Sequence, residues 1–148
     1  MTTAIVIDAS AAVEIVARTS IGTELEHLLP RQAVPWIPDG LFDAEVMSVL
    51  RRWELRATLT PSQVAAAMNR VINWRLRRAA VSSLTAEAWT MRHNVTFTDA
   101  CYVSLAQRID APCAHQRPTP RRDPEPAGSN PASRLTARRP ILAQHKNF

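Results

Sequence analysis

Short apolar runs alternate with longer stretches of helical periodicity along the first part of this 148-residue chain. Residues 4–7 form an apolar, mostly β-branched run that stops at Asp8, which is typical of a short strand. The apolar positions within 11–16 then predict a helix that Ser10 can cap. A second helix is predicted for residues 21–29. The chain therefore begins with a short strand that is followed directly by a helix.

The segment 33–38 is apolar but contains Pro35 and Pro38. Because proline cannot donate a hydrogen bond to a neighbouring strand, this segment is expected to be an edge strand or an extended segment. Asp39 is then expected to cap a third helix, whose apolar positions recur at three- and four-residue intervals. The members of this apolar stripe are Phe42, Val46, Val49, Leu50 and Trp53.

The clearest helix start lies at Thr60, where a following proline and Gln63 complete a capping box. This motif predicts a helix over residues 61–73. The remaining predicted elements are a short strand within 75–81, a helix capped by Ser83 that reaches about His93, and a helix capped by Thr98 over 99–109. Strands separated by helices predict an α/β fold with a parallel sheet.

Composition and charge change at Pro112. Residues 1–112 hold 11 basic and 11 acidic side chains, whereas residues 113–148 hold 7 basic and 2 acidic ones together with six of the eleven prolines. The formal net charge of +5 therefore belongs to the second segment, and it says little about nucleic-acid binding by the first. We predict a folded domain over 1–112 and a basic Pro/Arg-rich tail over 113–148, which is too poor in large apolar residues to offset its ordering entropy.

The N-terminal apolar run contains Asp8 and Glu14 and has no basic leader, so it resembles neither a signal peptide nor a membrane span. The two cysteines, Cys101 and Cys113, are too few for a disulfide scaffold and lack the spacing of a metal-binding pair. We therefore expect a soluble cytoplasmic protein without a membrane partner.

Acidic side chains at three places are candidates for chemistry. Asp8 ends a predicted strand, where sites form in parallel sheets, although capping the next helix is an equally simple role. Asp99 lies in the first turn of the last helix, where a carboxylate also complements the helix dipole. On the third helix, Asp43 and Glu45 flank the apolar stripe at similar angles, and periodicity does not choose between them.

Several carboxylates that converge on one point repel one another unless a cation lies between them. Oxygen ligands of this kind suit Mg²⁺ or Mn²⁺. Such an ion can activate a water molecule and neutralise the charge of a phosphodiester under attack. The acidic positions are therefore compatible with metal-assisted phosphodiester hydrolysis.

Three segments carry a recognisable pattern. Residues 5–11 read Ile-Val-Ile-Asp-Ala-Ser-Ala, residues 38–52 hold Glu45 on the predicted third helix, and residues 92–106 contain Thr-x-x-Asp-Ala-x-Tyr-x-x-Leu-Ala. In this order and at this spacing they resemble PIN-domain ribonucleases of the VapC toxin type over residues 4–112. The segment around Asp99 is the most specific part of the resemblance.

The resemblance implies a PIN-like parallel sheet flanked by helices and an endoribonuclease that depends on Mg²⁺ or Mn²⁺. Members of this family are usually homodimeric toxins that cut tRNA or rRNA and are held inactive by a cognate antitoxin. The resemblance selects Glu45 over Asp43. It implies that Asp8 and Asp99 are the principal metal ligands, with Glu45 binding directly or through water, whereas Tyr102 is interpreted as a packing residue.

The family continues from an Ala-Pro turn into a strand that ends in Thr-x-Asp. Here Ala111-Pro112 is followed by Cys-Ala-His-Gln-Arg-Pro, so the fourth acid is absent and the sheet is expected to be incomplete at its C-terminal strands. Codons permitted for residues 113–123, read one nucleotide further on, can encode Val-Leu-Thr-Asn-Asp-Arg-Arg-Leu-Ala-Ala. We therefore hypothesise a frameshift near Pro112, which leaves the activity of this form in doubt.

Two other functions stay open. The chain can be a catalytically inactive remnant that still binds an antitoxin or dimerises through its early helices. It can also be an RNA-binding protein whose basic tail makes the contact, which is the weakest of the three readings because out-of-frame coding in a GC-rich gene yields Arg, Pro and Ala without selection for binding.

Overall fold

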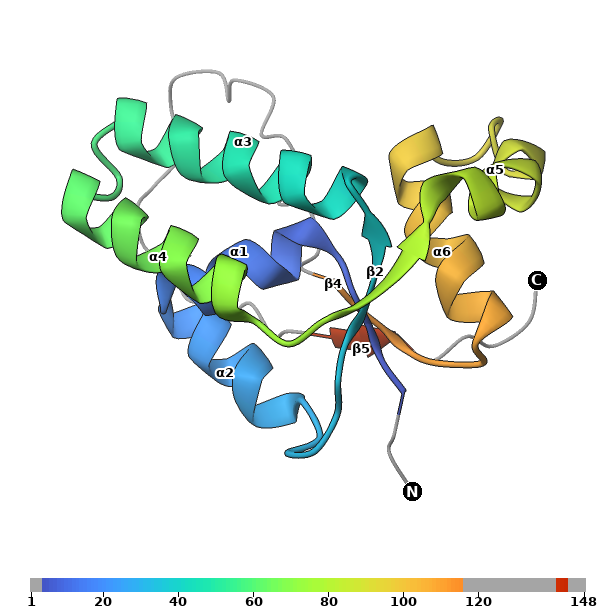
Figure 1. Ribbon diagram of the computed structural model, residues 1–148, viewed down its shortest axis with the longest axis horizontal. Coiled ribbons are helices and arrows are strands. Elements are labelled where there is room, and N and C mark those ends of the chain that lie inside the picture. The colour runs from blue at the N-terminus through green and yellow to red at the C-terminus, as the bar shows by residue number, and fades with distance from the viewer. Residues whose placement is uncertain (1–3, 116–140, 144–148) are drawn as a thin grey trace, which may run out of the picture.

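The computed structural model describes residues 4–115 and 141–143. In chain order its elements are β1 (Val6–Ile7), α1 (Ala9–Ala17), α2 (Ser20–Leu28), β2 (Trp36–Asp39), α3 (Leu41–Leu55), α4 (Pro61–Asn73), β3 (Arg77–Ala80), α5 (Val81–Thr90), α6 (Phe97–Arg108), β4 (Cys113–His115) and β5 (Ile141–Ala143). The sheet has the order β3-β2-β1-β4-β5, in which the first four strands are parallel and β5 is antiparallel to β4. In Figure 1, α1 to α4 lie on one side of the strands and α5 and α6 on the other. This confirms the predicted α/β fold.

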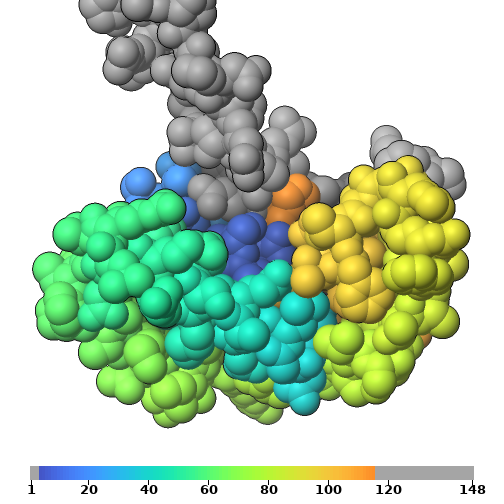
Figure 2. Space-filling model, turned by 90° about the horizontal axis from the view of Figure 1, so that it is seen from above, coloured from blue at the N-terminus to red at the C-terminus, as the bar shows by residue number. Residues whose placement is uncertain are grey.

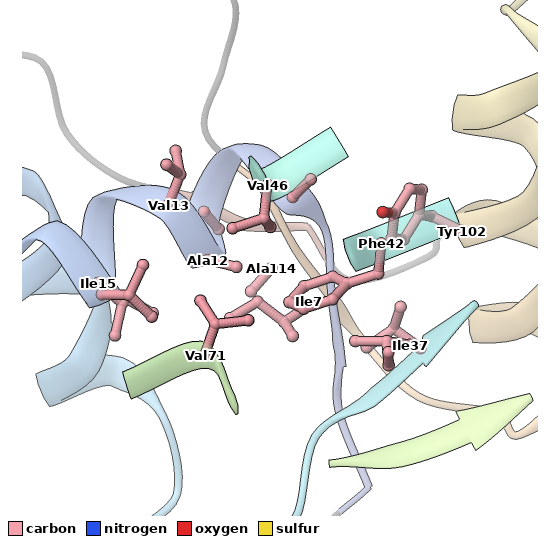
Figure 3. Close-up of a cluster of buried hydrophobic side chains, with 14 of the residues drawn as sticks. Ile7, Ala12, Val13, Ile15, Ile37, Phe42, Val46, Val71, Tyr102 and Ala114 are labelled. Atoms are coloured by element: carbon pink, nitrogen blue, oxygen red, sulfur yellow. The ribbon is translucent and has the colours of Figure 1, made fainter. Parts of the chain in front are cut away.

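The core lies around β1, whose two residues have no exposed surface. A central parallel strand is covered on both faces, which explains why residues 4–7 read as a continuous apolar run instead of an alternating one. Phe42 and Val46 of α3 pack in the same cluster as Ile37 of β2 and Ile7 (Figure 3). The predicted stripe on α3 is therefore its buried side, with Val49 and Trp53 at the margin.

The proline-containing strand β2 is internal, not at an edge as predicted, because β1 and β3 pair on its two sides. The backbone N–H of Trp36 donates to Ile5 O at 2.8 Å, so alternate residues of β2 face β1. Pro38 is two residues further along and faces the same way, beyond Val6–Trp36, the pair that joins β1 to β2. The β1–β2 ladder therefore ends before Pro38, whereas on the other side Pro38 stays in register with Ala79 of β3.

Helix α4 begins and ends as predicted, and both hydrogen bonds of its capping box are present. The caps of other helices differ from the predictions by one to three residues. Helix α1 is capped by Asp8 instead of Ser10, α3 by Gly40 instead of Asp39, α5 by Ala80 instead of Ser83, and α6 by Thr96 instead of Thr98. Each choice depends on where the preceding strand or loop ends, which a single capping side chain does not determine.

The sequence after Pro112 was expected to hold no strand, and this was wrong for the residues that the structure describes. Cys113–His115 form β4, which lies parallel to β1 and occupies the place expected for the missing strand. Ile141–Ala143 form β5 against it. Backbone atoms of β1 supply partners to any extended segment that reaches them, whatever its side chains. The expected disorder of the tail concerns residues 116–140 and 144–148, which lie outside the described residues.

Candidate functional site

Asp8 lies where β1 passes into α1. Its carboxylate Oδ1 accepts a hydrogen bond of 2.8 Å from the backbone N–H of Ala11 and one of 2.7 Å from the hydroxyl of Ser10. Asp8 is therefore the cap of α1, as the simpler interpretation of this residue held, and Ser10 is its partner in the first turn. The position is also the carboxyl end of the central strand, where sites form in parallel sheets.

Asp99 occupies the third position of α6. The hydroxyl of Thr96 donates to Asp99 Oδ2, and it accepts a 3.2 Å hydrogen bond from the backbone N–H of Asp99. The carboxylate is thus oriented by the same side chain that begins the helix. A threonine three residues before an aspartate is the local signal that predicts this arrangement.

Glu45 lies in the second turn of α3, and its Oε2 accepts a 2.7 Å hydrogen bond from the hydroxyl of Tyr102 on α6. The interpretation of Tyr102 as a packing residue was therefore incomplete. Its ring is buried, but its hydroxyl reaches a candidate site residue. Its spacing of three residues from Asp99 on one helix was the available signal, since such residues share a face.

Asp99 lies near enough to both of the other acids to influence their pKa values. Burial raises the pKa of Asp8 above its ordinary value, against the hydrogen bonds of Ala11 and Ser10, and the charge of Asp99 adds to the rise. Burial also raises the pKa of Glu45, and Asp99 again adds to it. In Figure 2 the blue β1–α1 segment lies in a depression between the green-cyan α3 and the yellow-orange start of α6. The structure thus brings the predicted residues Asp8, Glu45 and Asp99 to one edge of the sheet.

Asp43, the alternative that periodicity left open, is engaged elsewhere. Arg78 of β3 donates from both terminal guanidinium nitrogens to the Asp43 carboxylate and from one of them to Asp39 Oδ1 at 2.9 Å. The guanidinium holds the pKa of Asp43 below its ordinary value. Asp43 is therefore part of a surface ion pair between β3 and α3.

The place of the missing fourth acid is next to β4. The β1–β4 register pairs Ile7 with Ala114, and the backbone N–H of Asp8 donates to Ala114 O at 3.1 Å. The next residue, His115, interacts with the Asp8 charge and lowers its pKa. Desolvation, with a smaller contribution from Asp8, raises the pKa of Cys113 to about 12, so this thiol is neutral. The sequence alone gave no reason to single out His115.

The three carboxylates are the type of ligand that a hard divalent cation prefers, but their side chains do not lie close enough together to hold one ion by themselves. Three carboxylates supply oxygen ligands, and burial, with a smaller contribution from the charge of Asp99, raises the pKa of Asp8 and of Glu45. Within residues 4–115 and 141–143, however, no three Asp, Glu, His or Cys side chains lie close enough to hold one metal ion. A cation here therefore requires water to complete its shell, which Mg²⁺ commonly retains.

No helix in the described part of the chain is long and apolar enough to cross a membrane.

Comparison with protein-family models gives no match. Among curated proteins, the chain is 38% identical over 103 residues to Ribonuclease VapC3 of Mycobacterium tuberculosis, covering 70% of this chain and 74% of that protein. It is 35% identical over 108 residues to Ribonuclease VapC1 of the same organism, covering 72% and 80%. Among solved structures, the crystal structure of Mycobacterium tuberculosis VapC20, titled a sarcin-ricin loop cleaving toxin, matches with a TM-score of 0.52 at 20% identity over 72% of this chain and 84% of that one. The structural match shows a shared fold.

The sequence relatives and the fold agree with each other. The two matches extend over 103 and 108 residues, which is nearly the length of the described segment 4–115. An identity of 38% over 74% of Ribonuclease VapC3 shows that this chain belongs to the PIN-domain VapC family of ribonucleases.

Proposed function

We propose that the chain is a Mg²⁺- or Mn²⁺-dependent endoribonuclease, the toxin of a VapBC-like pair. The observation that carries the proposal is the convergence of Asp8, Glu45 and Asp99 at the carboxyl edge of the sheet, where burial raises the pKa of Asp8 and of Glu45 and the charge of Asp99 adds to both rises. Acids that repel one another, of which Asp8 and Glu45 are partly buried, cost stability unless a cation or a ligand offsets the repulsion. Ribonuclease names among the relatives support RNA as the substrate.

Asp8 and Asp99 would hold the cation, with Glu45 binding it directly or through water. A bound divalent ion supplies charge neutralisation at the phosphodiester and acidifies a coordinated water. The chain's own hydroxyl groups orient the carboxylates: Ser10 donates to Asp8 and Thr96 to Asp99. The bonds to Asp8 end on Oδ1, and the bond from Thr96 to Asp99 ends on Oδ2.

Family membership supports four further features of the proposal. A cognate antitoxin would hold the toxin inactive, the RNA would be of the tRNA or rRNA class, and the toxin would form a homodimer in the cytoplasm. A gene adjacent to the one for this chain is the place to seek the antitoxin.

One observation favours a second candidate, a catalytically inactive antitoxin-binding or dimerising remnant. The fourth acid of the family is absent from the strand position next to β1, and His115 stands beside Asp8 instead. Within the described residues the remaining acids do not form a closed metal cluster. Activity and binding therefore have to be measured separately.

The test is cleavage of tRNA and of rRNA fragments by the purified chain in Mg²⁺, with EDTA as a blank. The variants are Asp8→Asn and Asp99→Asn, with Asp43→Asn as the matched control because it removes a nearby charge outside the acidic site. We expect cleavage by the wild type and the control, and none by the first two variants. Cleavage that survives in Asp8→Asn would exclude the proposed mechanism.

An inactive wild type that still forms a stable complex with the co-expressed antitoxin would support the remnant. The tail hypothesis has its own outcome, which is salt-sensitive RNA binding that survives Asp8→Asn but disappears when Arg117, Arg121 and Arg122 are replaced by Gln.

A further inference from the structure

We propose that Tyr102 is a positioning residue for Glu45, and that its hydroxyl holds the glutamate at the acidic site. The inference rests on the proposed function, since it assigns a role within the same site. The position of the Glu45 carboxylate can be measured without any activity assay.

The position of the Tyr102 hydroxyl is fixed by packing. The side chain is 4% exposed and belongs to α6, three residues after Asp99, so both residues lie on one face of the helix. Figure 3 shows the ring beside Phe42, the buried residue near the start of α3. A tyrosine ring held on its sides has little freedom to move its hydroxyl, which is therefore a rigid donor.

The hydroxyl of Tyr102 donates its hydrogen bond to Glu45. The distance from Tyr102 Oη to Glu45 Oε2 is 2.7 Å, and the two residues are 57 positions apart in the chain. Within residues 4–115 the structure gives no hydrogen bond to the other oxygen, Oε1. The bond thus fixes one carboxylate oxygen and leaves the second for a water or a cation.

The bond also favours the ionised form of Glu45. Burial raises the pKa of Glu45, and the charge of Asp99 repels its ionised form, whereas the hydrogen bond from Tyr102 lowers that pKa. A glutamate has three rotatable bonds, so without a fixed donor it can turn away from the other acids. Ser10 and Thr96 hold Asp8 and Asp99 from neighbouring positions, but Glu45 is held from a different helix.

The test compares wild type, Tyr102→Phe, Glu45→Gln and the double variant. Phenylalanine keeps the packed ring and removes the hydroxyl, and thermal unfolding checks that the fold persists. The readouts are the crystal structure of Tyr102→Phe, the affinity for Mn²⁺ alone, and the kcat and KM of RNA cleavage. We expect the Glu45 carboxylate to turn away or to lose its single conformation, and Mn²⁺ affinity and kcat to fall on the order of 10- to 100-fold, as for other residues that orient ligands. KM for RNA should change little.

If Tyr102 acts through Glu45, adding Tyr102→Phe to Glu45→Gln should cause no further loss. Additive losses, or a Glu45 carboxylate that stays in place in Tyr102→Phe, would overturn the inference. Failure of the proposed function has a different signature, because then the wild type neither cleaves RNA nor binds Mn²⁺, while the crystal structures still report whether Tyr102 holds Glu45.

Discussion

The hydroxyl of Ser10 donates a 2.7 Å hydrogen bond to Asp8, whose carboxylate also caps α1. An asparagine at position 8 can keep both bonds through its side-chain oxygen, since Asn and Asp are equally good caps. It removes a carboxylate whose pKa is raised by desolvation and, to a smaller extent, by Asp99. The Asp8→Asn variant therefore keeps the cap of α1 and removes only the charge of the carboxylate.

We predict that Asp8→Asn raises the Tm of the metal-free protein at neutral pH by roughly 2–5 °C, corresponding to about 1 kcal/mol for a chain of this size. The reason is that desolvation raises the pKa of the partly buried Asp8 and so disfavours its charged form, whereas asparagine carries no charge to desolvate. Calorimetry in EDTA measures the difference. A lower Tm for Asp8→Asn would mean that the carboxylate stabilises the fold, contrary to the raised pKa.

The same pair of proteins tests the pH dependence. Because the folded pKa of Asp8 is raised, the folded state keeps this proton to a higher pH than the unfolded state, whose value is about 3.9. Stability is therefore lost as pH rises through the folded pKa. The Tm advantage of Asp8→Asn should be near zero below about pH 4 and largest at neutral pH. A constant advantage across this range would show that the pKa is not raised.

Gly22 of α2 lies against α1, where an added Cβ would come within 1.9 Å of the backbone oxygen of Glu14. Gly22→Ala should therefore force the two helices apart and lower the free energy of unfolding by about 3 kcal/mol. The matched control is Gly40→Ala, since Gly40 has φ of 78° but no atom within 4 Å of the added Cβ. Its cost should be about 1–2 kcal/mol from backbone strain alone. Urea denaturation compares the two, and equal costs would argue against the close α1–α2 approach.

Arg78 joins β3 to the start of α3 through Asp43 and Asp39. Its side chain is 40% exposed, so Arg78→Gln should lower the free energy of unfolding by about 1 kcal/mol or less, with a smaller effect in 1 M salt. RNA cleavage should stay near the wild-type rate, with Arg51→Gln on the exposed side of α3 as the control. Loss of cleavage in Arg78→Gln without loss of stability would instead bring Asp43 into the site.

The frameshift hypothesis predicts that the gene encodes Thr-x-Asp in the frame one nucleotide further on, just after the codon for Pro112. A chain that carries this shifted sequence after Pro112 should cleave RNA faster than the present one, because it restores a fourth acid beside Asp8. Sequencing of the gene decides the first statement and a cleavage assay the second. If the shifted frame lacks Thr-x-Asp, the hypothesis is wrong.

Local patterns in the sequence determined the elements and the family. The capping box at Thr60 gave the start of α4 because its two hydrogen bonds link residues only three positions apart. The β-branched run before Asp8 and the Thr-x-x-Asp motif are likewise local, and they led to the predicted fold class. The roles of Asp8, Glu45 and Asp99 in catalysis stay a prediction.

Tertiary structure alone decided the features that depend on distant partners. Asp43 and Glu45 have similar angles on α3, but their hydrogen-bond partners differ: Arg78 from β3 contacts Asp43 and Tyr102 from α6 contacts Glu45, and these partners lie 35 and 57 residues away in the chain. The strand at Cys113–His115 has too few residues to show periodicity, and it forms because β1 offers a backbone edge to pair with. Periodicity tells which side of an element is buried, but the partner that reaches a given side chain is set by how the elements pack.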